Sequence, residues 1–351
     1  FDITPASNKV TNFMDNNQIA DWAKDAVNAL YSAGYIKGYS DNTFRPNSYI
    51  TRAEAVYLIS EIAKQIYSKE GEYTSGKILG NVIINTANVT LKDTEISGNL
   101  YITEGVGDGD VTIENVKVDG KVIVSGGGEQ SVKIKNATIN QLKIDKKGTP
   151  VRVVAEGNTN VKLAQVISSA KIEDNSQKAG FAVVTIENSN KPIEVELKGY
   201  IASVKISGEA VVKTTPDTQI ENLRVEASDA TLSLEGSVNK LEVANANNVV
   251  VSEKANVKEL VVNSEEAKVT IQGTVEFAQI AAAKEAVIAS NAKVEKLSVK
   301  DQNANIKVDG TVNTVLIEVP SAKINNQEVK KGDEVKIEKG GIVSVEKQSQ
   351  Q

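Results

Sequence analysis

The six residues Ile220-Glu221-Asn222-Leu223-Arg224-Val225 carry the pattern that decides the fold: two apolar positions three apart, then a third two residues later. The same pattern recurs at 238–243 and 257–262, and again on either side of them. Its middle apolar residue falls at positions 204, 223, 241, 260, 278, 297 and 315, so successive copies are 18 or 19 residues apart. A fixed period of this length indicates stacked structural repeats.

Each period also holds a second short apolar run that ends at a turn residue, as in 231–236 (TLSLEG) and 305–310 (NIKVDG). These β-branched runs predict two or three short strands per repeat. At ~3.3 Å per residue, a coil of this size closes on itself and stacks on the next at ~4.8 Å. The sequence therefore predicts an all-β parallel β-helix with inward ladders of Val, Leu and Ile. A drifting period without a strict hexapeptide repeat favours a right-handed winding.

The predicted β-helix extends over residues 79–345. Its early repeats are less regular, since Val82, Leu100, Val122 and Leu142 are 18, 22 and 20 residues apart. The stretch 146–199 does not align with the repeat, which predicts insertions that emerge as loops. Open strand edges at the ends of such a stack invite aggregation unless they are covered. We expect residues 323–345 to cap one end and the N-terminal part of the chain to cover the other.

Residues 1–65 have a different character and predict a small helical module, followed by a polar linker at 66–78. Apolar residues at helical spacing begin after Asp21, which we expect to cap that helix, and Gly34 ends it. The turn-rich stretch 38–46 predicts a loop. A second helix is predicted from a capping box at Thr51–Glu54, with an apolar face formed by Val56, Ile59 and Ile62.

The stretch from Phe13 to about Ala63 resembles the S-layer homology family. Five sequence elements carry the resemblance in order: Phe13-Met14-Asp15, Trp22-Ala23, Gly38-Tyr39, Thr43-Phe44-Arg45-Pro46 and Ile50-Thr51-Arg52-Ala53-Glu54. Modules of this family usually work in sets of three, and one complete copy is present here, with residues 1–12 interpreted as the tail of a preceding copy. Residue 1 is Phe with no leader-like segment behind it, so we expect a processed or trimmed chain.

The resemblance implies noncovalent binding of a secondary cell-wall polymer with acidic sugars. It assigns the anion contact to Arg52, whose guanidinium offers a fork of donors beside the positive end of a helix. It also implies that Trp22 presents a flat apolar face to a sugar ring. The full set of implied polymer-binding residues is Asp15, Trp22, Gly38, Tyr39, Thr51 and Arg52. The alternatives from the residues alone are an intramolecular salt bridge for Arg52 and a core position for Trp22. Asp41 fits an Asx turn better than a calcium ligand, and Glu54 fits a capping-box partner better than a contact to the polymer.

Composition excludes several function classes. The net charge is −6, which argues against nucleic acid as a partner. No cysteine is present, so disulfides and thiolate metal sites are excluded, and no apolar run is long enough to span a bilayer. The chain also contains no histidine, and past the linker its only arginines are Arg152 and Arg224.

Two kinds of chemistry on the β-helix remain open. Paired carboxylates serve glycoside hydrolysis, and the best acidic cluster is 104–110, where glycines permit a tight loop. Asp108 and Asp110 in this loop are candidate calcium ligands, the alternative being a solvated turn. Beyond the linker there is no tryptophan to form a sugar platform.

These observations predict a non-catalytic protein of the bacterial cell wall or S-layer, extracellular, anchored through its N-terminal module and carrying a rigid β-helical stalk. It is expected to need no cofactor, calcium aside, and its partner is cell-wall polysaccharide, with lattice contacts open. The alternative is a surface protein whose β-helix binds or degrades polysaccharide.

Overall fold

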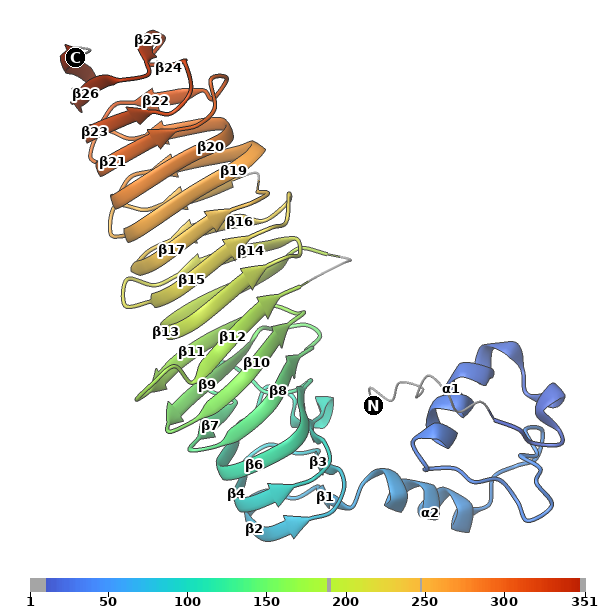
Figure 1. Cartoon of the computed structure of the whole chain (residues 1–351). Helices are drawn as coiled ribbons and strands as arrows, with labels where there is room; N and C mark the ends of the chain where they lie inside the picture. Colours follow the sequence, from blue (N-terminus) through green and yellow to red (C-terminus); the bar gives the residue numbers. More distant parts are fainter. Residues whose placement is uncertain (1–10, 188–190, 247, 348–351) are drawn as a thin grey trace.

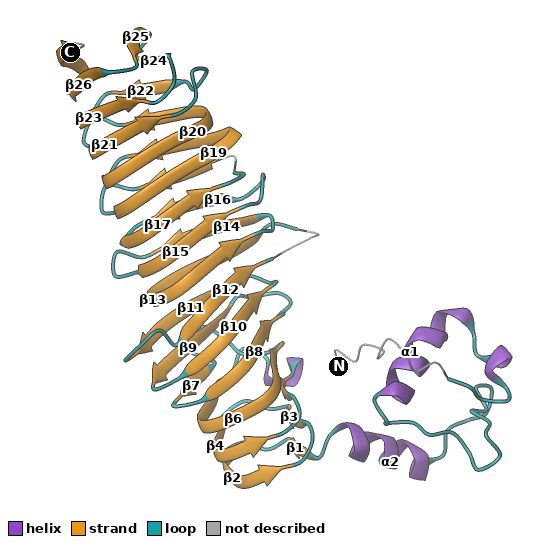
Figure 2. Ribbon diagram, in the orientation of Figure 1, coloured by secondary structure: helices purple, strands orange, loops and turns teal. Residues whose placement is uncertain are grey.

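The computed structural model describes residues 11–187, 191–246 and 248–347 (Figure 1). A small helical module is followed by a long stack of strands, which Figure 2 shows as the bulk of the molecule. The module contains η1 (Asn16–Gln18), α1 (Asp21–Ser32) and α2 (Arg52–Ile62). One further short helix, η2 (Glu104–Val106), projects from the stack. Within the described ranges, no helix combines the length and apolar character needed to cross a membrane.

The strands of the stack follow one another along the chain in this order: β1 (Gln65–Tyr67), β2 (Gly71–Ile78), β3 (Val82–Ile84), β4 (Val89–Ile96), β5 (Leu100–Ile102), β6 (Val111–Val124), β7 (Lys133–Lys135), β8 (Thr138–Ile144), β9 (Val151–Gly157), β10 (Asn160–Val166), β11 (Ala170–Ser176), β12 (Phe181–Ile186), β13 (Ile193–Ile206), β14 (Ala210–Thr214), β15 (Gln219–Val225), β16 (Thr231–Leu234), β17 (Ser237–Val243), β18 (Asn248–Val251), β19 (Asn256–Ile271), β20 (Thr274–Ile288), β21 (Lys293–Val299), β22 (Ile306–Val308), β23 (Thr311–Ile317), β24 (Ser321–Ile324), β25 (Gln327–Lys330), β26 (Asp333–Glu338) and β27 (Gly341–Lys347).

Each strand from β1 to β22 pairs in parallel with the equivalent strand of the next coil. The register places Leu223 beside Leu241 and Leu241 beside Leu260. The same column continues through Ala278, Leu297 and Val315. The period read from the sequence is therefore one coil of a parallel β-helix, as predicted.

The core is a continuous aliphatic column inside the coils. Along β15, β17 and the first half of β19 the first, fourth and sixth residues of the apolar pattern are buried, and the residues between them are partly or fully exposed. Leu241, for example, is 0% exposed. Burial of this kind stabilises by about 25 cal/mol per Å² of apolar surface, so stacked coils support one another where a single coil would not hold.

Looped insertions were expected at 146–199, of which residues 188–190 lie outside the described residues, and the described part is mostly strand. Strands β9 to β12 and the first half of β13 occupy most of this stretch and continue the stack. The repeats were hidden because these coils turn a sharp corner within a strand. One such corner begins in the earlier coils, at Asp93 within β4 and Asn115 within β6, and continues at Asn136 after β7 and Gly157 at the end of β9. Their φ angles are 44°, 55°, 50° and 63°, a conformation that residues of this type tolerate.

The stretch 66–78, expected to be a linker, forms the first coil instead. β1 pairs with β3, and β2 pairs with β4 over nearly its whole length. Two tyrosines close the interior at this end: the rings of Tyr67 and Tyr73 lie 4.4 Å apart, and Tyr67 is 3% exposed. Figure 1 shows α1 and α2 beside this end rather than across it, so among the described residues the aromatic pair, and not the N-terminal module, closes the interior.

The other end changes from parallel to antiparallel pairing. β24 and β25 form one hairpin, β26 and β27 form another, and β26 pairs with β23. Lys330-Lys331-Gly332-Asp333 lies at the turn between β25 and β26, where Gly332 has a φ of 89°. The hairpins cover the last coil, in agreement with the cap expected at 323–345.

The N-terminal module is built around Phe13, which packs against Tyr31 of α1 and Phe44 of the loop, with ring centroids 5.3 and 5.5 Å away. Gly34, with a φ of 80°, ends α1 as expected. Asp21 is not the N-cap: Ala20 holds that position, and the Asp21 carboxylate accepts a hydrogen bond from Lys24 at 2.6 Å instead.

Helix α2 differs from its expected packing. Its capping box is present, with Thr51 and Glu54 exchanging hydrogen bonds. Its apolar face, however, is not buried, since Val56 is 66% exposed and Ile59 is 55% exposed.

A single asparagine joins the module to the stack. The side-chain amide of Asn81 donates to the Ile62 carbonyl at 2.8 Å and to the Tyr35 hydroxyl at 3.0 Å, while its oxygen accepts from the Asn99 amide at 2.8 Å. The Asn81 carbonyl also accepts from the Lys64 amide at 2.9 Å. The end of α2 is thus bonded directly to the first two coils.

Candidate functional site

The loop of the N-terminal module is held by two carboxylates. Asp15 accepts hydrogen bonds from the backbone amides of Phe44 at 2.8 Å and Arg45 at 2.7 Å. Asp41 accepts from the Thr43 hydroxyl and amide, which is the predicted Asx turn, and from the Arg45 guanidinium at 2.8 Å. The Phe44 amide lowers the pKa of Asp15, and the Thr43 and Arg45 donors lower the pKa of Asp41 to about 2.

A second group of contacts fastens this loop to α2. The Tyr39 hydroxyl donates to Glu54, whose other oxygen accepts from the Thr51 amide at 2.8 Å. The Arg45 guanidinium lies 4.1 Å from the centre of the Tyr39 ring. The Tyr39 hydroxyl and the Thr51 donors lower the pKa of Glu54 to about 2. The ionised Glu54 therefore links the loop to the start of the helix.

This arrangement predicts unusual acid resistance of the loop. Because the folded-state pKa of Glu54 lies below its ordinary value of 4.5, its stabilising effect is present above that value and is lost as the pH falls through about 2. In an NMR titration, we expect the amide signals of Thr51 and Glu54 to stay unchanged at pH 4 and to move only near pH 2. The variant Glu54→Gln should abolish this step, and a midpoint near 4.5 in the native chain would contradict the assigned contacts.

The six residues implied as polymer-binding divide into two groups. Arg52, at the first position of α2, is exposed, and in the described part of the chain its guanidinium makes no ion pair. Trp22 is 88% exposed on α1, outside the core. Asp15, Tyr39 and Thr51 hold the loop and helix in place.

Gly38, like Asp15, Tyr39 and Thr51, has a structural role in holding the loop. It has a φ of 76°, and a side chain there would overlap the Phe13 ring. Contact of any of the six with a polymer stays a prediction.

Sequence reasoning missed a concave surface between the loop and α2. Its lining includes Tyr35, Tyr49, Ile50 and Tyr57, with the cations Lys37 and Arg45 at its rim. Tyr49 is fully exposed and Tyr57 is 52% exposed. Tyr49 and Tyr57, on either side of the capping box, could have indicated this surface from the sequence. Neither belongs to the five sequence elements that carry the family resemblance.

Residues 12–56 match the family model described as the S-layer homology domain. The chain carries an S-layer homology domain. It is 48% identical over 42 residues to Cell surface glycoprotein 1 of Acetivibrio thermocellus, which covers 12% of this chain and 2% of that protein. It is 54% identical over 39 residues to the Cellulosome-anchoring protein of the same organism, covering 11% and 9%.

A third relative is Outer membrane protein SlpA of Deinococcus radiodurans, 44% identical over 55 residues, covering 16% of this chain and 4% of that protein. The chain thus spans less than a tenth of the length of each of these relatives. No solved structure matches the chain. The S-layer homology domain and its surface relatives place the chain at the bacterial cell surface.

Outside the S-layer homology domain, the acidic loop 104–110 was the candidate calcium site. The Asp108 carboxylate accepts hydrogen bonds from the Lys146 ammonium at 2.8 Å and the Thr149 hydroxyl at 2.7 Å, which lower its pKa. The Asp110 carbonyl accepts from the Asn88 amide. Among the residues that the structure describes, no three His, Cys, Asp or Glu side chains gather as a metal site. An ammonium group is thus the cation beside Asp108, and calcium binding stays an untested prediction.

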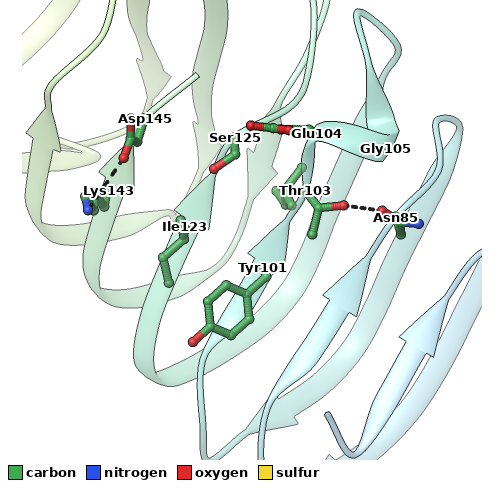
Figure 3. Close-up of a pocket in the computed structure, with 10 residues that line it drawn as sticks. Asn85, Tyr101, Thr103, Glu104, Gly105, Ile123, Ser125, Lys143 and Asp145 are labelled. Atoms are coloured by element: carbon green, nitrogen blue, oxygen red, sulfur yellow. Dashed lines mark hydrogen bonds and ion pairs between the residues drawn. The ribbon is translucent and has the colours of Figure 1, made fainter. Parts of the chain in front are cut away.

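A second concave surface lies on the outside of the first coils (Figure 3). Tyr101 and Ile123 form its floor, and Asn85, Thr103 and Ser125 lie along one side. The Thr103 hydroxyl donates to the Asn85 side-chain oxygen. Glu104 at the start of η2 and the pair Lys143 and Asp145, 3.6 Å apart, complete the lining. We call this surface, defined by those residues, the stalk groove.

Proposed function

We propose that the S-layer homology domain attaches this chain to a secondary cell-wall polymer and that the β-helix is a rigid, non-catalytic stalk. The observation that carries the proposal is the exposed Arg52 guanidinium at the first turn of α2. A guanidinium that forms no ion pair with any described residue, placed where the helix dipole also attracts anions, suits a carboxylate or ketal-linked acid on a sugar. The Cellulosome-anchoring protein, similar to this chain over the domain, is named for an anchoring role.

The unburied face of α2 supports the same proposal. Val56, Tyr57 and Ile59 are each more than half exposed. Apolar side chains gathered on one helix are ordinarily covered. Since S-layer homology modules usually work in sets of three, neighbouring modules are the partners that we propose for this face.

The stalk shows charges that pair with one another rather than converge on a site. Lys92 lies 2.7 Å from Glu72 and 3.8 Å from Glu114, which in turn lies 2.8 Å from Lys135. Such alternation along the stack neutralises each coil against the next. Together with the absence of histidine from the sequence, it supports a structural role. Cleavage of pectin or cellulose by the chain would contradict the non-catalytic part of the proposal.

Replacing Arg52 with alanine is expected to reduce retention on purified cell walls by about ten- to a hundredfold, since one charge-assisted contact contributes roughly 1.5–3 kcal/mol. A sedimentation assay with walls measures it. The matched control is Lys24→Ala, which removes an exposed cation paired with Asp21 on α1. Both variants should melt like the native chain, and equal wall retention by Arg52→Ala would remove Arg52 from the site.

A further inference from the structure

One outward-facing column of the stalk changes character along its length. In the first coils its members are Ile83, Tyr101 and Ile123, which lie side by side in register. From the next coil the same column is polar over six coils, through Lys143, Gln165, Thr185, Lys205, Arg224 and Glu242, and apolar members return only farther along, at Val261 and Leu316. The apolar run at this end of the column extends from Ile66 to Ile123, and its last two members, Tyr101 and Ile123, form the floor of the stalk groove.

The neighbouring column supplies hydrogen-bonding groups in the four coils that border the groove. Asn85, Thr103, Ser125 and Asp145 each follow the last apolar residue of their strand. Within the described residues, no hydrogen bond engages the Asn85 amide nitrogen or the Ser125 hydroxyl. These polar groups therefore repeat at the strand spacing of ~4.8 Å beside an apolar floor.

The wall of the groove is built by close packing. η2 lies against the first coil because Gly105 has no side chain, and a Cβ at this position would overlap Asn85. The charges around the groove balance: Glu104 lies 3.8 Å from Lys147, and Asp145 lies 3.6 Å from Lys143. A ligand that carries strong charge gains nothing from such a lining.

We propose that the stalk groove binds a neutral polysaccharide whose chain runs along the stalk axis. Pyranose rings present C–H faces that suit an apolar floor and hydroxyls that suit amide, hydroxyl and carboxylate groups. The length of one ring in an extended chain is close to the strand spacing, so successive sugars meet equivalent groups on successive coils. Because Glu104 is paired with Lys147 and Asp145 with Lys143, the groove carries no excess positive charge that would favour an acidic polysaccharide.

The test is titration calorimetry of the full chain with cellohexaose, xylohexaose and mannohexaose, with hexagalacturonate as the acidic comparison. We expect measurable binding of at least one neutral hexasaccharide and weaker binding of the acidic one. Ile123→Asp, which places a charge on the apolar floor, should weaken binding at least about tenfold. Ser125→Ala, which leaves the floor intact, should weaken it by a smaller factor.

The matched control is Val261→Asp, the same change in the same outward column several coils away. It should leave the affinity unchanged. No binding of any neutral hexasaccharide, or equal losses for Ile123→Asp and Val261→Asp, would overturn the proposal. Arg52→Ala separates this site from the wall anchor, because it should lower retention on cell walls and leave hexasaccharide affinity intact.

Discussion

Replacing Gly199 with alanine is expected to destabilise the middle of the stalk by about 2–4 kcal/mol, the sum of a left-handed backbone conformation and an overpacked contact. Gly199 lies at the corner inside β13, with a φ of 84°. It sits directly over Asp174 of the preceding coil, and an added Cβ would overlap the Asp174 carbonyl oxygen. Because that atom is backbone in a hydrogen-bonded strand, it has no freedom to move aside.

The control for this prediction is Gly148→Ala. Gly148 has nearly the same φ, 86°, but no atom lies within 4 Å of a Cβ built there. Its replacement should therefore cost only the backbone term of about 1 kcal/mol. Urea denaturation followed by circular dichroism measures both changes, and equal losses for the two variants would show that the contact with Asp174 does not matter.

Leu241→Ala is expected to cost about 2–5 kcal/mol, toward the upper end of that range. Leu241 is fully buried between Leu223 and Leu260, which the parallel register holds in line. Since each neighbour is fixed by its own ladder of hydrogen bonds, the cavity has little means of collapsing. Hydrogen exchange should show faster opening of the amides in β15 and β19, the strands on either side.

The comparison for Leu241 is the adjacent Lys240→Ala. Lys240 is exposed and lies 3.4 Å from Glu259 on the outer face. Exposed pairs of this kind contribute about 0–1 kcal/mol. A loss at Leu241 no larger than at Lys240 would contradict the assignment of inward and outward positions.

The fold of the later stalk could be predicted because its signal is simple. An apolar residue recurs at the same place in each coil, and a column such as Leu223, Leu241 and Leu260 is recognisable from its spacing alone. The earlier coils were harder to assign, since corners at residues such as Asn115 and Asn136 insert a position and shift the alternation. The coil at 66–78 was missed because its inward residues are Tyr67 and Tyr73 rather than aliphatic side chains.

The candidate site was only partly readable. The roles of Thr51, Glu54 and Asp41 follow from short-range hydrogen bonding, which local sequence specifies well. The hydrogen bonds from the Phe44 and Arg45 amides to Asp15 join residues about thirty positions apart. A single sequence does not predict contacts at that separation. The stalk groove was missed for the same reason, since it gathers residues from successive coils.

The hydrogen bonds between coils run along the axis of the stack, and the covalent chain crosses from one coil to the next only once. A pull between the two ends of the rod therefore loads these bonds lengthwise, so that coils detach singly from an end. Each detached coil of 18 or 19 residues adds about 60 Å of extended chain. A rod pulled in this way would lengthen in many small steps, one coil at a time, instead of unfolding in a single event.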